Sequence, residues 1–128
     1  MTYVNRVDVK VVTNSASAAN VNSSAVLNGL LYAVEFQPST VSPWSSAADF
    51  AITKESGANI LHVDLASGTG QMFFPRRAAN GTASGLFDQF GNASGLVPTM
   101  IPFADERANI VVASGGATTS GRVRFYLV

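Results

Sequence analysis

The sequence predicts an all-β fold: a single-domain antiparallel β-sandwich of jelly-roll or Greek-key type with about eight strands. Three observations lead to this prediction. Short apolar runs alternate with polar residues, loops rich in Gly, Pro, Ser and Asn separate the runs, and helical spacing is absent over any useful length. A chain of 128 residues fits one domain, which we expect over residues 1–128 with a long loop excursion at 76–98.

The first third of the chain predicts two strands. Residues 3–13 alternate between apolar and charged side chains, which is typical of a half-buried strand. Residues 13–24 are mostly small and polar, so we expect a loop. Residues 25–36 carry apolar side chains at both parities, which predicts a central strand buried on both sides for part of its length. Gly29 within this run indicates a bulge or bend.

The middle of the chain predicts a hairpin and a further strand. Two prolines flank Trp44, so we expect a loop there. Residues 49–54 and 59–65 are strand-like runs on either side of a Glu-Ser-Gly-Ala turn, and they predict a hairpin. A fifth strand at 71–74 ends at Pro75, because proline cannot continue a sheet ladder.

The excursion at 76–98 contains an internal repeat. Gly-Thr-Ala-Ser-Gly-Leu-Phe at 81–87 and Gly-Asn-Ala-Ser-Gly-Leu-Val at 91–97 follow each other at a spacing of ten residues. Each copy ends in two apolar residues, such as Leu86 and Phe87, which we expect to pack on the core. Two copies are too few for a solenoid, so this segment is interpreted as one long excursion.

The C-terminal part of the chain predicts a short strand and a second hairpin. The short strand is expected around residues 99–101. Runs 107–113 and 122–128 flank an uncharged segment with glycine near both ends, which predicts that they form a hairpin. The apolar side chains of the last run share one face, and they are Val123, Phe125 and Leu127. We expect the C-terminus to be held within the sheet.

Charge is sparse in this sequence. Only 12% of residues are charged, about half the usual share in soluble domains. Depletion of charge with arginine retained over lysine is typical of surfaces that become protein interfaces. The alternative, given equal weight, is a small β-protein with a polar, uncharged coat.

Composition also argues against several classes of function. A formal net charge of zero argues against a nucleic-acid groove, which needs a clustered positive field. The chain has no cysteine, which removes disulfides and thiolate sites. It lacks the pattern of a signal peptide and an apolar run of the roughly 18 residues needed to cross a membrane. We therefore expect a soluble protein made in a cytoplasm, without nucleic acid or membrane as partners.

His62 is the one histidine and the first candidate for chemistry. Asp64 lies two residues away on the same face of the expected strand, but a nucleophile-elbow sequence is absent. One histidine with scattered carboxylates also lacks the clustering that zinc or iron sites require. We expect a structural strand histidine, no enzyme, no metal and no cofactor.

Two further patterns resemble catalytic motifs and are better explained otherwise. Residues 116–122 superficially resemble a phosphate loop, but Arg122 and Val123 replace the required Lys-Ser/Thr pair and a strand follows. Asp105 and Glu106 are adjacent on a strand-like run, so they point to opposite faces and cannot easily share one site. A charge cluster at a strand entry is the simpler interpretation.

The most distinctive short motif is Phe-Phe-Pro-Arg-Arg at residues 73–77. We expect both aromatics, Phe74 included, to anchor the strand, and the proline to end it. The guanidinium groups of Arg76 and Arg77 then emerge together, with planar forks suited to carboxylates or loop carbonyls. Two interpretations stay open with equal weight: the arginines hold the 78–98 loop, or they contact a partner.

This motif, together with Glu-Arg-Ala-Asn-Ile-Val-Val-Ala-Ser-Gly-Gly at 106–116 and the terminal run 120–128, resembles a family of small proteins of tailed bacteriophages. They are encoded near the major capsid protein and include capsid cement, or decoration, proteins with a jelly-roll fold. The similarity of pattern extends over most of the chain and its motifs are moderately specific. Arg77 stands where family members usually have glutamine, and the repeat at 81–97 differs from the typical loop.

The resemblance implies a structural virion protein on the outer surface of an icosahedral capsid. It would bind the major capsid protein and further copies of itself, as a homodimer or homotrimer, and bridge capsid subunits. The candidate capsid or subunit contacts are Phe74, Arg76, Arg77, Leu86 and Phe87. The alternative is a carbohydrate- or host-binding module of a head or tail fibre, for which Trp44, Tyr32 and Tyr126 are the candidate exposed aromatics.

Overall fold

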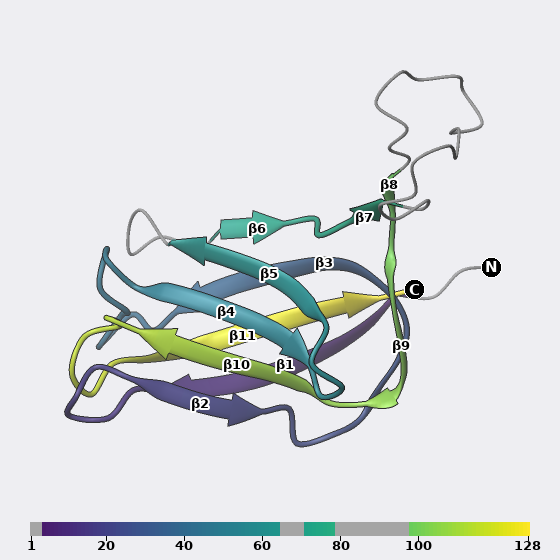
Figure 1. Ribbon diagram of the computed structural model, residues 1–128. Coiled ribbons are helices and arrows are strands. Elements are labelled where there is room, and N and C mark those ends of the chain that lie inside the picture. The colour runs from purple at the N-terminus through teal and green to yellow at the C-terminus, as the bar shows by residue number, and fades with distance from the viewer. Residues whose placement is uncertain (1–3, 65–70, 79–97) are drawn as a thin grey trace.

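Two antiparallel sheets pack face to face in the computed structural model, which describes residues 4–64, 71–78 and 98–128 (Figure 1). The strands are β1 (Asn5–Val12), β2 (Ala19–Asn22), β3 (Leu27–Pro38), β4 (Asp49–Lys54), β5 (Asn59–Asp64), β6 (Gln71–Phe73), β7 (Arg77–Ala78), β8 (Pro98–Thr99), β9 (Ile101–Glu106), β10 (Ala108–Ala113) and β11 (Ser120–Leu127).

Nine of these strands build the two layers. One sheet, here called sheet A, has the order β1-β11-β3-β6, and β9 also pairs with β3. The other, sheet B, has the order β2-β10-β4-β5, while β7 and β8 form a separate short pair. The predicted all-β sandwich is therefore confirmed, with nine strands in place of about eight. The described part of the chain contains no helix able to span a membrane.

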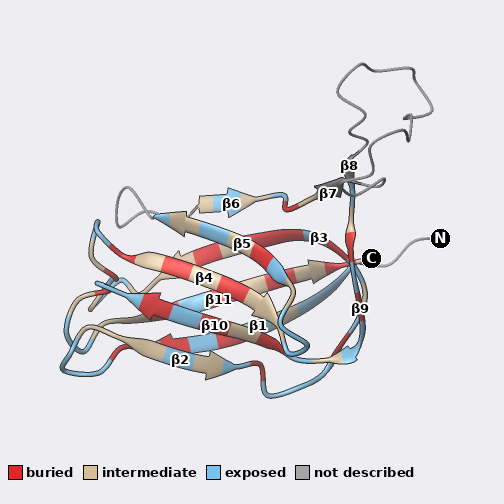
Figure 2. Cartoon of the chain, in the orientation of Figure 1, coloured by how far each residue is buried: buried red, intermediate tan, exposed pale blue. Residues whose placement is uncertain are grey.

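The core lies between the two sheets, as the buried stripes in Figure 2 show. The ring of Phe36 in sheet A meets Phe50 in sheet B edge-on, at 4.9 Å between centroids. Trp44, from the connection between β3 and β4, packs on Phe50 at 4.8 Å and is 2% exposed. A Cβ on Gly121 would lie 2.6 Å from the Trp44 ring, so only glycine allows this approach. The loop expected around Trp44 is confirmed, but its indole fills the core.

β3 changes its buried face within its length. Phe125 and Tyr126 of β11 oppose Val34 and Ala33, yet Leu127 opposes Leu31, so Tyr32 is an extra residue in β3. Such a bulge shifts the side-chain alternation by one. Before the bulge, the odd-numbered residues of β3 point to the core; after the bulge, the even-numbered residues do. The prediction of burial on both sides is confirmed only at Ala33 and Val34, and the remaining apolar pattern reflects this switch.

The second predicted hairpin is wrong. The strand at 107–113 corresponds to β10, which pairs with β2 and β4, whereas β11 pairs with β1 and β3. The glycine-rich connection therefore crosses between the sheets. Both strands bury one face, and placing them in opposite layers lets those faces pack against each other. The hydroxyl of Thr13 secures the crossover by donating to the carbonyl of Gly116 at 2.6 Å.

Residues 13–24 are also not entirely loop, because β2 lies within them and pairs with β10. Its side chains are small and polar, so the segment lacks the apolar alternation by which a strand is detected. By contrast, the hairpin at 49–54 and 59–65 is confirmed as β4 and β5. The strand at 71–74 is confirmed as β6, and β8 and β9 account for the strand expected around 99–101.

The ends of the long excursion are joined by the pairing of β7 with β8, in which Arg77 opposes Thr99 and Ala78 opposes Pro98. The repeat at 81–97, with Leu86 and Phe87, lies outside the described residues. At the C-terminus, Val128 exchanges two backbone hydrogen bonds with Leu30, at 2.9 and 3.0 Å. The expected anchoring of the C-terminus in the sheet is confirmed.

Candidate functional site

The end of β6 presents one aromatic to the core and the next to solvent. Phe73 is half-buried and meets Phe36 edge-on at 5.7 Å. Phe74 is 51% exposed, because successive side chains of an extended chain point to opposite sides. The prediction that both aromatics anchor the strand is therefore correct for Phe73 and wrong for Phe74.

Phe74 packs beside the bulge residue of β3. Its ring lies edge-on to Tyr32 at 5.6 Å, and the guanidinium of Arg76 lies 5.7 Å from the centre of the Tyr32 ring. Nη1 of Arg76 donates to the carbonyl oxygens of Tyr32 at 2.9 Å and Pro75 at 2.7 Å. We call Tyr32, Phe74 and Arg76 the aromatic corner.

The bulge explains how the corner is built. Tyr32 has no residue opposite it on β11, and its carbonyl accepts from Arg76. Arg76 is thus held by contacts within its own chain, to Tyr32 and Pro75. The side chain of Arg77 is likewise not described. Sequence reasoning identified Phe74 and Arg76 but not their contact with Tyr32, which depends on the register of β3.

Apolar exposure continues around the aromatic corner. Leu30 and Tyr32 share a parity of β3 and are 44% and 41% exposed. Met72 lies on β6, two positions before Phe74, and is 44% exposed. Since β6 pairs with β3, Met72 and Phe74 come from the segment that runs beside the strand carrying Leu30 and Tyr32.

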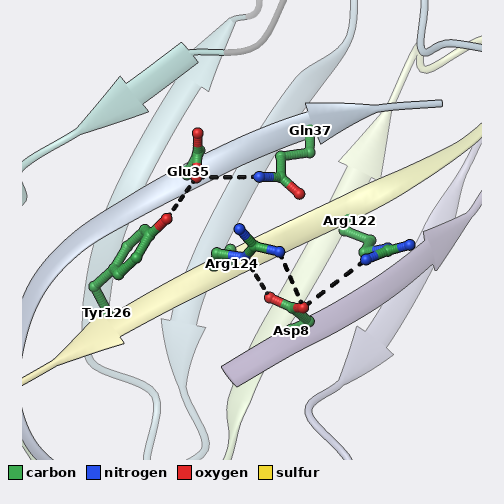
Figure 3. A network of polar contacts seen from close by, with 6 residues as sticks. All are labelled: Asp8, Glu35, Gln37, Arg122, Arg124 and Tyr126. Atoms are coloured by element: carbon green, nitrogen blue, oxygen red, sulfur yellow. Dashed lines mark hydrogen bonds and ion pairs between the residues drawn. The ribbon is translucent and has the colours of Figure 1, made fainter. Parts of the chain in front are cut away.

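The outer face of sheet A carries an ion-pair and hydrogen-bond network (Figure 3). Asp8 of β1 accepts two hydrogen bonds from Arg124 of β11, from Nε at 2.7 Å and Nη2 at 3.3 Å. The hydrogen bond from Arg124 lowers the pKa of Asp8, and the same contact raises the pKa of Arg124. On β3, Glu35 accepts from the Tyr126 hydroxyl at 2.7 Å and from Nε2 of Gln37 at 3.1 Å. This network ties β1, β11 and β3 together.

His62 has a different acidic neighbour from the one the sequence indicated. Its Nε2 lies 2.6 Å from Oδ1 of Asp49, which sits across the hairpin directly opposite Asp64. Donor atoms of these three residues lie within 4.8 Å of one another, so an imidazole and two carboxylates are available to a divalent ion. The sequence-based expectation overlooked Asp49, which the hairpin register could have supplied.

The remaining candidates resolve into structural roles. Glu106 pairs with Lys54 at 3.0 Å, and this contact lowers the pKa of Glu106. Asp105 has a positive φ of 60°, and its backbone N–H donates to Oδ1 of Asn28. Its carboxylate takes no part in the Lys54–Glu106 pair. Of the aromatics considered for sugar binding, Trp44 is buried, Tyr126 is half-buried with its hydroxyl on Glu35, and Tyr32 is exposed.

Comparison with known proteins shows no established family. Neither a family model nor a curated protein matches the chain. Among solved structures, the crystal structure of FLHE is similar over 98% of each chain, with 12% identity and a TM-score of 0.46.

Proposed function

We propose that this chain is a structural virion protein that binds the outer surface of an icosahedral phage capsid and stabilises it by bridging subunits. Its partners are the major capsid protein and further copies of itself, and the role needs no catalysis. The motif resemblance at 73–77, 106–116 and 120–128 supports this proposal. The observation that supports the choice of contact surface is the exposed aromatic corner, on a chain with only 12% charged residues.

The composition of the corner favours protein binding. Tyrosine and arginine are enriched among the residues that contribute most to interfaces, where aromatic rings fill pockets on the partner. Tyr32 and Phe74 expose 41% and 51% of their surface, and Leu30 and Met72 extend the apolar area. A partner that covers this edge would bury that surface from water.

The corner is also ordered before any partner arrives. Two carbonyl oxygens hold Arg76, and Phe74 and Tyr32 restrict each other's rings. Binding then costs less side-chain entropy than it would for freely rotating residues. Because a shell presents many equivalent positions, a modest contact repeated in each oligomer is enough for stable attachment.

The test uses purified shells that lack this protein. We expect the Phe74→Ala/Arg76→Ala variant to fold and to co-sediment poorly with the shells. Decorated wild-type shells should survive heating or dilution better than shells mixed with the variant. Val41→Ala is the matched control, because Val41 is 88% exposed in the loop after β3. Normal decoration by the double variant, with its own melting temperature sharply lower, would show that the corner serves only folding.

The carbohydrate-binding alternative has one structural feature in its favour, the exposed ring of Tyr32 beside Phe74. Binding of the protein to purified host glycans, lost in Tyr32→Ala and accompanied by no affinity for shells, would replace the capsid role with this one.

A further inference from the structure

A polar hollow of about 530 Å³ lies on sheet A, away from the aromatic corner. It forms where β1 and β3 end and β11 begins. Its polar lining includes Lys10, Gln37, Ser39, Thr40, Ser120 and Arg122. The volume is within the range of small-molecule sites.

We propose that this hollow binds a small acidic ligand that also carries hydroxyl groups, the chemistry of a hexuronic acid. The inference is independent of the capsid role, since it uses other residues at another place on the molecule.

Two cations stand side by side in the lining of the hollow. Lys10 and Arg122 are direct cross-strand partners, an arrangement that like charges disfavour unless an anion lies between them. The nearby carboxylate of Asp8 does not fill this role well. It accepts from Arg124 at 2.7 Å, while Nη1 of Arg122 lies 4.0 Å from it (Figure 3). Lys10 makes no ion pair with any residue that the structure describes.

A hydrogen-bond acceptor stands beside the cations. Gln37 is the direct partner of Arg122 on the other side of β11. Its amide nitrogen donates to Glu35, which can only accept when ionised, so its amide oxygen is left as the outward acceptor. A simple carboxylate would use the cations alone. A hydroxy acid can also donate a hydroxyl to Gln37 and bond to the serine and threonine hydroxyls.

The fixed charges favour a monoanion over a dianion. Lys10 and Arg122 are the cations that line the hollow, while the carboxylates of Asp8 and Glu35 lie beside it, bonded to Arg124 and to Gln37. One carboxylate on the ligand can lie between the two cations, whereas a phosphate dianion would bring a second negative charge toward the two carboxylates.

The experiment is an NMR titration of the full chain with sodium glucuronate, glucose and inorganic phosphate at equal ionic strength. We expect glucuronate to shift the backbone amides at 37–40 and 120–122 and to bind more tightly than phosphate, with glucose causing no saturable change. Arg122→Ala and Lys10→Ala should each weaken glucuronate binding at least about tenfold, as expected for loss of a charge-assisted contact. Melting temperatures establish that both variants fold.

Arg6→Ala is the matched control, since Arg6 is an exposed cation on the same face of β1. Equal weakening by Arg6→Ala would mean that only the general positive field attracts the ligand, and the proposal would be wrong. If phosphate bound as tightly as glucuronate, the ligand hydroxyls would have no role in recognition. If glucose bound as tightly, the two cations would have none. Shifts confined to other amides would place the ligand elsewhere.

Discussion

The outer faces of the two sheets are built from different chemistry. In sheet A, charged side chains pair across β1, β11 and β3, with Arg124 and Asp8 at the centre (Figure 3). In sheet B, the amide of Asn109 on β10 donates to Asn20 at 2.8 Å and Asn22 at 2.9 Å on β2. Val111 lies on the same face and is 39% exposed.

This difference shows where a chain with few charges places them. The ion pairs of sheet A and the amide contacts of sheet B both connect neighbouring strands, but only the former depend on pH and salt. The hollow and the aromatic corner also belong to sheet A. Sheet B instead offers a neutral amide surface with the His62 cluster at its β4–β5 side.

Replacing Phe125 should have the largest effect, because it removes support from beneath both faces. Its ring is fully buried in β11. Phe125→Ala should lower the free energy of unfolding by about 3–5 kcal/mol by leaving a cavity. Chemical denaturation followed by tryptophan fluorescence measures this change. Val41→Ala, at an exposed loop position, is the control, and equal midpoints for the two variants would contradict the core assignment.

The second prediction is that the contribution of the sheet A network to stability depends on pH. The pKa of Asp8 is lower in the folded chain than its ordinary value of 3.8, chiefly because of the hydrogen bond from Arg124. The unfolded chain therefore takes up the proton first as the pH falls. The stabilisation is present above pH 3.8 and is lost below it, down through the folded pKa.

Asp8→Asn should remove this part of the acid sensitivity and be less stable than wild type at neutral pH. Melting temperatures between pH 2 and 7 test this expectation. Asp105→Asn is the control, because asparagine tolerates the positive φ at that position. An unchanged pH profile for Asp8→Asn would mean that the network of sheet A adds nothing measurable.

The third prediction concerns the amide contacts of sheet B. Asn109→Ala should cost about 0.5–1 kcal/mol, since its two hydrogen bonds are exposed to water. The loss should be the same at pH 3 and pH 7, in contrast to Asp8→Asn. Urea denaturation at both values measures it, and a loss confined to one pH would show that the two faces are coupled.

The smallest effect is expected at His62. Its side chain is 70% exposed and pairs with Asp49, so His62→Ala should change stability by less than about 0.5 kcal/mol. We also expect shell binding or infectivity to be retained. Loss of either, with an unchanged melting temperature, would reveal a role for the His62 cluster, and a zinc titration of wild type and variant would then identify it.

Local patterns in the sequence were enough to locate most strands. The alternation before Val12 predicts β1, and the turn between Lys54 and Asn59 predicts the β4–β5 hairpin. Both signals lie within a few residues, where side-chain parity and turn chemistry act directly. Of the predicted contact residues, Phe74 and Arg76 lie in the aromatic corner, while the side chain of Arg77 and residues Leu86 and Phe87 are outside the described part. The phage resemblance stays a prediction.

Only the tertiary structure decided which strands are neighbours. Alternation states which face of a strand is buried, but not which sheet it joins, so β10 and β11 were expected to form a hairpin and instead lie in opposite layers. The extra residue at Tyr32, which creates the aromatic corner, is defined only by the register of β3 against β11. Register and sheet membership depend on competition among strands distant in sequence, because each apolar face can be buried against several partners and only the complete core selects among them.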